Sequence, residues 1–128
     1  MVKSVLFNSN IEFEHQRWKR EIFFWKKELK SLNIRLSELI KRWENKEVLL
    51  KIGYYQKQII LYEDAIQNLL EMIEYQQTRN TPNFNLGPFM RSSQLFNKHI
   101  ELRIKMEAQR EIFSDLKKNL FRFIEKFL

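Results

Sequence analysis

The sequence predicts an all-α protein, an antiparallel three-helix bundle of long helices with coiled-coil-like heptad packing. Three observations lead to this fold class. The 128 residues include two glycines and two prolines, so few turns interrupt the chain. Apolar residues recur at alternating steps of three and four along three separate runs, which places each run on one side of a helix. Two breaks separate the runs, one short and one long.

The first helix is predicted over about residues 10–44. Ser9-Asn10-Ile11-Glu12 has the capping-box pattern that starts many helices. The core positions of this helix read Ile11, His15, Trp18, Ile22, Trp25, Leu29, Leu32, Leu36, Leu39 and Trp43.

The second helix is predicted over about residues 47–77, after a break at residues 44–47. Such a short break favours an antiparallel neighbour. Gly53 lies within the helix and costs up to about 1 kcal/mol relative to alanine. The core positions read Val48, Ile52, Tyr55, Ile59, Tyr62, Ile66, Leu69, Ile73 and Gln76.

A loop is predicted over residues 78–91, where the periodicity stops and two prolines and a glycine occur. The third helix follows over about residues 92–127, with Ser92 or Ser93 as its predicted cap. Its core positions read Leu95, His99, Leu102, Met106, Gln109, Phe113, Leu116, Leu120, Phe123 and Phe127.

Composition favours one soluble domain over residues 1–128. The chain has no cysteine, which excludes disulfides and thiolate sites and fits a reducing compartment. It shows neither a signal-peptide pattern nor a run of about 18 apolar residues that could span a membrane. We therefore expect a cytoplasmic protein.

Pairing of the helix ends predicts one polar layer. If Trp43 lies level with Phe127, the offset between the first and third helices is 84, and His99 falls level with His15. Pairing across the short break places Gln76 at the same level. This layer is interpreted first as a device that fixes register. The alternative is a metal site of His15, His99 and Glu12, since Glu12 and His15 have the spacing used in di-iron bundles. Phe96 stands where a second such motif would need a carboxylate.

Apolar residues outside the core positions exceed what a monomeric bundle needs. Either the N-terminal residues or the Phe84–Met90 segment cover them, or two bundles associate as a homodimer; the dimer is favoured. The predicted interface comprises Phe23, Phe24, Tyr54, Ile60, Leu61 and Tyr75, and further outer positions are Ile34, Ile40, Ile100, Ile104, Phe121 and Ile124.

The net charge of +7 permits attraction to phosphate, so a basic bundle that binds nucleic acid is a further alternative. Acidic residues are interleaved with the basic ones, however, and no DNA-binding motif occurs. No phosphate-binding loop, nucleophile elbow or paired histidine motif is present either. We expect no enzyme activity and no cofactor, and favour a bundle that acts through protein–protein association with a second copy or another helical protein.

Several short segments resemble a family of small all-helical bundle proteins from Bacteroidetes with no known activity. They are His15-Gln16-Arg17-Trp18, Phe24-Trp25-Lys26-Lys27-Glu28-Leu29, Tyr55-Gln56-Lys57-Gln58-Ile59 and the final residues 121–128. The resemblance implies a helical bundle. Members of that family carry a histidine near the position of Tyr54, so this chain departs from them there.

Overall fold

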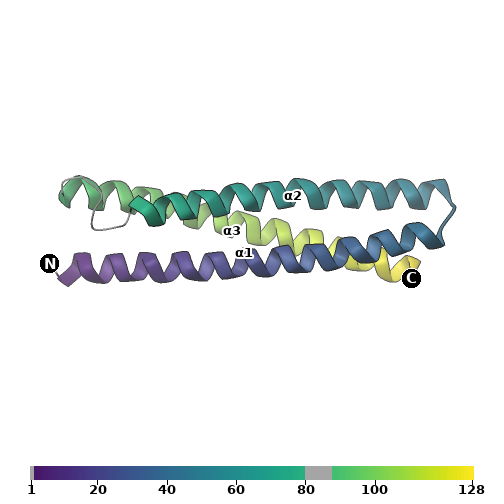
Figure 1. The fold of residues 1–128 in the computed structure, drawn as a ribbon, viewed down its shortest axis with the longest axis horizontal. Coiled ribbons are helices and arrows are strands. Elements are labelled where there is room, and N and C mark those ends of the chain that lie inside the picture. Colours follow the sequence, from purple (N-terminus) through teal and green to yellow (C-terminus); the bar gives the residue numbers. More distant parts are fainter. Residues whose placement is uncertain (1, 80–87) are drawn as a thin grey trace.

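The computed structural model contains three long helices, α1 (Val2–Arg42), α2 (Lys46–Arg79) and α3 (Pro88–Phe127). The structure describes residues 2–79 and 88–128, with side chains at 10–79 and 96–128. Helix α2 runs antiparallel to α1, and α3 runs parallel to α1 (Figure 1). All three pairs of helices are in contact, so the predicted all-α three-helix bundle is confirmed. Within the described residues, no helix carries a stretch long and apolar enough to cross a membrane.

Two helix starts differ from the sequence prediction. Helix α1 begins at Val2, so Ser9 and Asn10 lie inside it and are not its cap. Helix α3 begins at Pro88, which also places Ser92 and Ser93 inside a helix. Proline suits a first helical position because its fixed φ is helical and it lacks an amide hydrogen that would need a partner. Serine and asparagine cost a helix interior less than 1 kcal/mol each, so capping residues alone do not set a boundary.

The short break between α1 and α2 is capped by Asn45. Its side-chain oxygen accepts hydrogen bonds from the backbone amides of Glu47 at 2.9 Å and Val48 at 3.3 Å. These are two of the amides that a helix start leaves without partners. The backbone amide of Trp43 still donates to Leu39, so the chain reverses direction within three residues.

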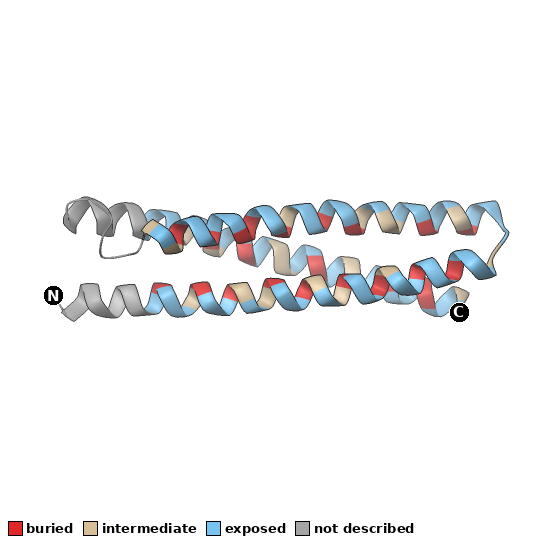
Figure 2. Cartoon of the chain, viewed as in Figure 1, coloured by how far each residue is buried: buried red, intermediate tan, exposed pale blue. Residues whose placement is uncertain are grey.

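The predicted core positions are confirmed: each of them with a described side chain is buried or half-buried (Figure 2). Two further residues join the core, Leu70 and Ile124. The prediction that Ile124 belongs to an outer apolar stripe was therefore wrong. Ile124 lies seven residues after Lys117, whose side chain reaches α1, and residues seven apart share one side of a heptad-packed helix. Its position therefore faces α1 and is 1% exposed.

The register between α1 and α3 is set by a direct contact. The indole nitrogen Nε1 of Trp43 donates a hydrogen bond to the backbone carbonyl of Phe127 at 2.9 Å, and their rings meet edge to face. The two residues are 84 apart, the predicted offset. Halfway along the bundle, Trp25, Tyr62 and Phe113 pack against one another with ring centroids 5.6 to 6.3 Å apart.

Candidate functional site

The predicted polar residues of one layer, His15, Gln76 and His99, are all buried, towards the end of the bundle opposite Trp43. The imidazole rings of His15 and His99 lie 5.2 Å apart between centroids. Trp18 stacks on His99 with a centroid separation of 4.8 Å. The structure therefore brings together the two histidines that lie 84 residues apart in the sequence.

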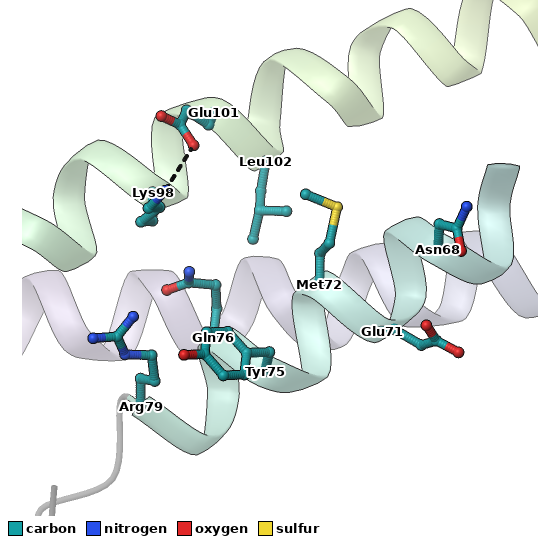
Figure 3. A pocket seen from close by; sticks show the side chains of 9 residues that line it. All are labelled: Asn68, Glu71, Met72, Tyr75, Gln76, Arg79, Lys98, Glu101 and Leu102. Atoms are coloured by element: carbon teal, nitrogen blue, oxygen red, sulfur yellow. Dashed lines mark ion pairs between the residues drawn. The ribbon is translucent and has the colours of Figure 1, made fainter.

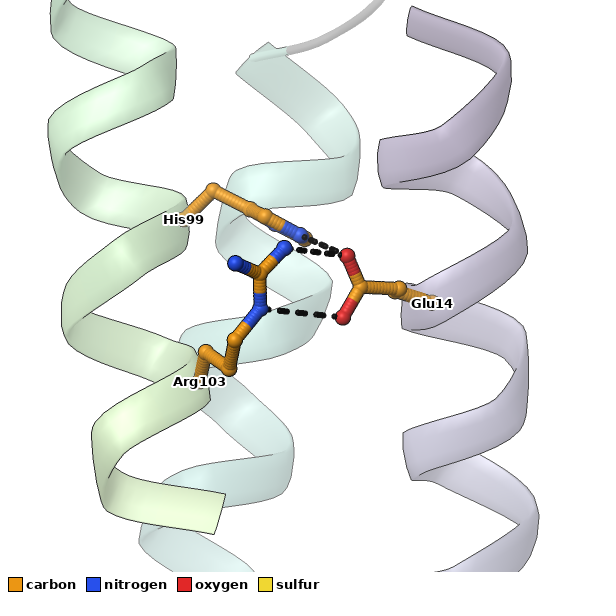
Figure 4. Close-up of polar contacts among 3 residues, drawn as sticks. All are labelled: Glu14, His99 and Arg103. Atoms are coloured by element: carbon orange, nitrogen blue, oxygen red, sulfur yellow. Dashed lines mark hydrogen bonds and ion pairs between the residues drawn. The ribbon is translucent and has the colours of Figure 1, made fainter. Parts of the chain in front are cut away.

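Glu14 connects this layer to the surface (Figure 4). Its carboxylate lies 3.0 Å from His99 Nε2, and Arg103 Nε donates to its other oxygen at 3.2 Å. A second guanidinium nitrogen of Arg103 donates to the oxygen that His99 contacts. A carboxylate accepts hydrogen bonds, so His99 donates from Nε2, and its Nδ1 has no hydrogen-bond partner among the side chains that the structure describes.

The surroundings shift the pKa of Glu14 and His15 downward for different reasons. Burial alone would raise the pKa of Glu14, but the hydrogen bonds from Arg103 and His99 hold it below the ordinary 4.5. Burial lowers the pKa of His15 from 6.5 to about 4, and the nearby His99 adds to this shift. His15 is therefore neutral at pH 7. Neither of its ring nitrogens has a hydrogen-bond partner among the described residues.

The predicted metal ligands do not gather around one point. Glu12 is exposed, and its carboxylate accepts hydrogen bonds from Gln16 at 3.2 Å and Gln77 at 3.3 Å. The carboxylate that meets His99 belongs instead to Glu14, which is already held by Arg103. Among the described residues, no group of three histidine, aspartate or glutamate side chains could hold a metal ion.

Three ion pairs between α1 and α3 were not predicted from the sequence. Glu14 pairs with Arg103, Glu21 with Arg110 and Glu28 with Lys117, each pair 89 residues apart. We call these six residues the ion-pair ladder. The acids recur every seven residues on α1, and the bases recur every seven residues on α3. Charged residues that recur every seven residues beside a core are typical of ion pairs between packed helices, so this repeat in the sequence predicts the ladder.

The six predicted interface residues are all exposed, with exposed fractions of 50% to 59%. They do not form one surface. Phe23 lies beneath Lys26, which bonds to Gln67 of α2, so it flanks the contact between α1 and α2. Phe24 borders a different hollow, together with Glu21, on the α3 side of α1.

Tyr54, Leu61 and Tyr75 do share one side of α2. They are spaced by seven and fourteen residues, so they occupy one heptad position. Tyr54 and Tyr75 each line a hollow whose other wall is α3. We call the surface formed by Tyr54, Leu61, Met72 and Tyr75 the outer stripe of α2.

The larger of these hollows lies between α2 and α3 near the polar layer (Figure 3). Its volume is about 600 Å³, and Met72, Tyr75 and Gln76 face Lys98 and Leu102 across it. Lys105 reaches the sulfur of Met72 at 3.8 Å. Among the described side chains, no ion pair joins α2 to α3, in contrast to the ladder between α1 and α3.

The nucleic-acid alternative rested on the net positive charge, and three lysines of α1 and α3 are engaged in contacts between helices. Lys19 bonds to Gln77, Lys26 to Gln67, and Lys117 to Glu28. These contacts hold the three lysines against neighbouring helices, and the charge of Lys117 is paired with that of Glu28.

Comparisons with protein-family models, with curated proteins and with solved structures gave no match. The resemblance to small Bacteroidetes bundle proteins therefore stays a prediction.

Proposed function

We propose that this protein is a non-enzymatic helical bundle that acts through protein–protein association, with a second copy of itself as the first partner. The observation that carries the proposal is the outer stripe of α2. Tyr54, Leu61 and Tyr75 lie on one side of the helix, and each exposes more than half of its surface. A helix on the surface of a monomeric bundle normally has polar residues there.

The energetics favour covering this stripe. Transferring a large apolar side chain from water into an interface contributes about 1.5–3 kcal/mol when it becomes fully buried. Three or four such residues in a row can stabilise an association, provided that their sum exceeds the entropic cost of bringing two chains together. Scattered apolar residues need no partner, but a stripe that repeats with the heptad is typical of an interface.

The direct test is the solution mass by light scattering coupled to size exclusion, across a range of concentrations. We expect a mass near twice the 15.9 kDa of the chain. The variant Leu61→Asp places a charge in the centre of the stripe and should shift the protein to monomer. Phe24→Asp is the matched control, because Phe24 is equally exposed but lies on another side of the bundle.

Each outcome has a definite meaning. A dimer that Leu61→Asp dissociates and Phe24→Asp leaves intact supports the proposal. A wild-type monomer at every concentration contradicts self-association. A dimer sensitive to Phe24→Asp alone would place the interface on α1. We also propose a cytoplasmic location, which the absence of cysteine supports.

A further inference from the structure

The charged residues of α2 are divided between its two halves. Residues 46–60 carry Lys46, Lys51 and Lys57 against Glu47, which gives +2. Residues 62–79 carry Glu63, Asp64, Glu71 and Glu74 against Arg79, which gives −3. Leu61, in the middle of the outer stripe, lies at the boundary between the two halves.

Four charged residues near the outer stripe form no ion pair with another described residue. Lys51, Lys57, Asp64 and Glu71 are all exposed, and none of them takes part in an ion pair among the described residues. Between α1 and α3, in contrast, three acidic side chains are each paired with a basic side chain in the ion-pair ladder. The outer side of α2 thus combines uncovered apolar residues with separated, unmatched charges.

We propose that two copies of this chain associate through α2, with the two α2 helices antiparallel and the two-fold axis near Leu61. This inference rests on the proposed self-association and specifies its surface and direction. A two-fold axis makes each contact occur twice, because the same surface of both copies takes part. The basic half of each α2 then lies against the acidic half of its partner, and both charge contacts are attractive.

The sequence positions agree with this centre. Lys51 and Glu71 are each ten residues from Leu61, and Leu50 and Met72 are each eleven residues from it. In the antiparallel pair these positions come level along the helices. Lys57 and Asp64, four residues before and three residues after Leu61, also come level, and because they are seven residues apart they lie on the same side of the helix, so that each lysine faces an aspartate of the other copy. A parallel pair would place Lys51 against Lys51 and Glu71 against Glu71, which is repulsive at both ends.

A charge exchange tests the direction of pairing. One variant carries Lys51→Glu and Lys57→Glu, and a second carries Asp64→Lys and Glu71→Lys. In a dimer of either variant with itself, residues of like charge would lie opposite each other across the two-fold axis. We therefore expect the Kd of that dimer to rise at least about tenfold. An equimolar mixture restores attraction at both contacts, so we expect the mixture to recover the dimer. All four positions are exposed, and circular dichroism checks that helix content is unchanged.

A cysteine test locates the axis, and the chain is suited to it because it has no native cysteine. We expect a short thiol-specific linker to cross-link two copies of the variant Leu61→Cys. Two copies of Leu50→Cys should not be cross-linked, because position 50 of one copy lies 22 residues, or about 33 Å, from position 50 of the other along the antiparallel pair. Leu50→Cys mixed with Met72→Cys should be joined.

The outcomes separate this inference from the proposed function. Dimers that neither charge variant weakens, or Leu50→Cys joined to itself, would overturn the antiparallel α2 pairing and leave self-association standing. A wild-type chain that stays monomeric would overturn both. The pairing is supported if each charge variant alone dimerises more weakly, the equimolar mixture recovers the dimer, and two copies of Leu61→Cys are cross-linked.

Discussion

The two ends of the bundle use equivalent core positions in opposite ways. At one end Trp43 and Phe127 pack ring to ring, and the single indole donor reaches a backbone carbonyl. At the other end, the corresponding layer contains His15 and His99, and three of their four ring nitrogens have no hydrogen-bond partner among the described residues. The first end is closed by aromatic packing, whereas the second contains polar groups whose burial is incompletely compensated.

This difference shows how a regular heptad repeat can distribute stability unevenly. A buried polar group without a hydrogen bond costs about 1–3 kcal/mol, while the same position filled by an apolar ring stabilises the core. The polar layer still fixes alignment, because sliding one helix by a heptad would separate His99 from Glu14.

The largest expected effect is on the acid sensitivity of the polar end. The pKa of His15 is lowered to about 4 by burial and by His99, with Glu12, Glu14 and Lys19 also nearby. The unfolded chain therefore binds more protons than the folded one between pH 4 and 6.5. The free energy of unfolding should fall as the pH falls through this window, by up to about 3 kcal/mol.

Chemical denaturation at pH 5 and pH 7 measures this effect. In the variant His15→Leu, the decrease in the free energy of unfolding from pH 7 to pH 5 should nearly vanish. Glu14 does not obscure this comparison, because its own contribution is lost only below about pH 4.5. A wild-type protein equally stable at both pH values would mean that His15 is solvated and titrates normally.

A smaller effect is expected for Glu14→Gln, which removes the charge that holds Arg103 and His99. We expect the free energy of unfolding at pH 7 to fall by about 1–2 kcal/mol. Glu21→Gln is the matched control, because Glu21 occupies the same heptad position and binds Arg110 in the same bidentate manner. Without a histidine partner, it should cost about 0.5–1 kcal/mol. Equal losses for the two variants would show that the His99 contact contributes nothing measurable.

The smallest effect concerns the aromatic end. Trp43→Phe keeps an aromatic ring but removes the hydrogen bond to Phe127, and we expect a loss of about 1 kcal/mol. The loss should be the same at pH 5 and pH 7, because Trp43 packs on Phe127 and Phe127 packs on Phe123, and phenylalanine carries no titratable group. A pH-dependent loss would mean that the two ends are coupled and do not differ in the way proposed.

The core was predictable from sequence because apolar periodicity reports directly on which side of a helix is buried. The same periodicity gave the offset of 84 that the contact between Trp43 and Phe127 confirms. The ion-pair ladder was not predicted, because acidic and basic residues are interleaved along α1 and this hides the seven-residue repeat of Glu14, Glu21 and Glu28. Glu12 was predicted as a metal ligand because it lies three residues before His15, whereas the carboxylate that contacts His99 belongs to Glu14.

Other features could not be predicted from local sequence. Capping residues indicated that α1 starts after Ser9, but serine also occurs inside helices at low cost, so the start at Val2 was not foreseen. Apolar residues outside the core were grouped into one interface. Three-dimensional placement separates Phe23, Phe24 and Leu61 onto three sides of the bundle, which follows from the helical positions once the neighbours of each helix are known.

The parallel arrangement of α1 and α3 has a mechanical consequence. The amino end of α1 and the carboxyl end of α3 lie at opposite ends of the rod (Figure 1). Tension applied to the two ends of the chain would slide α1 along α3 in shear, so that the three rungs of the ion-pair ladder are strained together and not one after another. Contacts that are strained together resist force cooperatively, so we expect the bundle to be mechanically stiff under tension along its long axis.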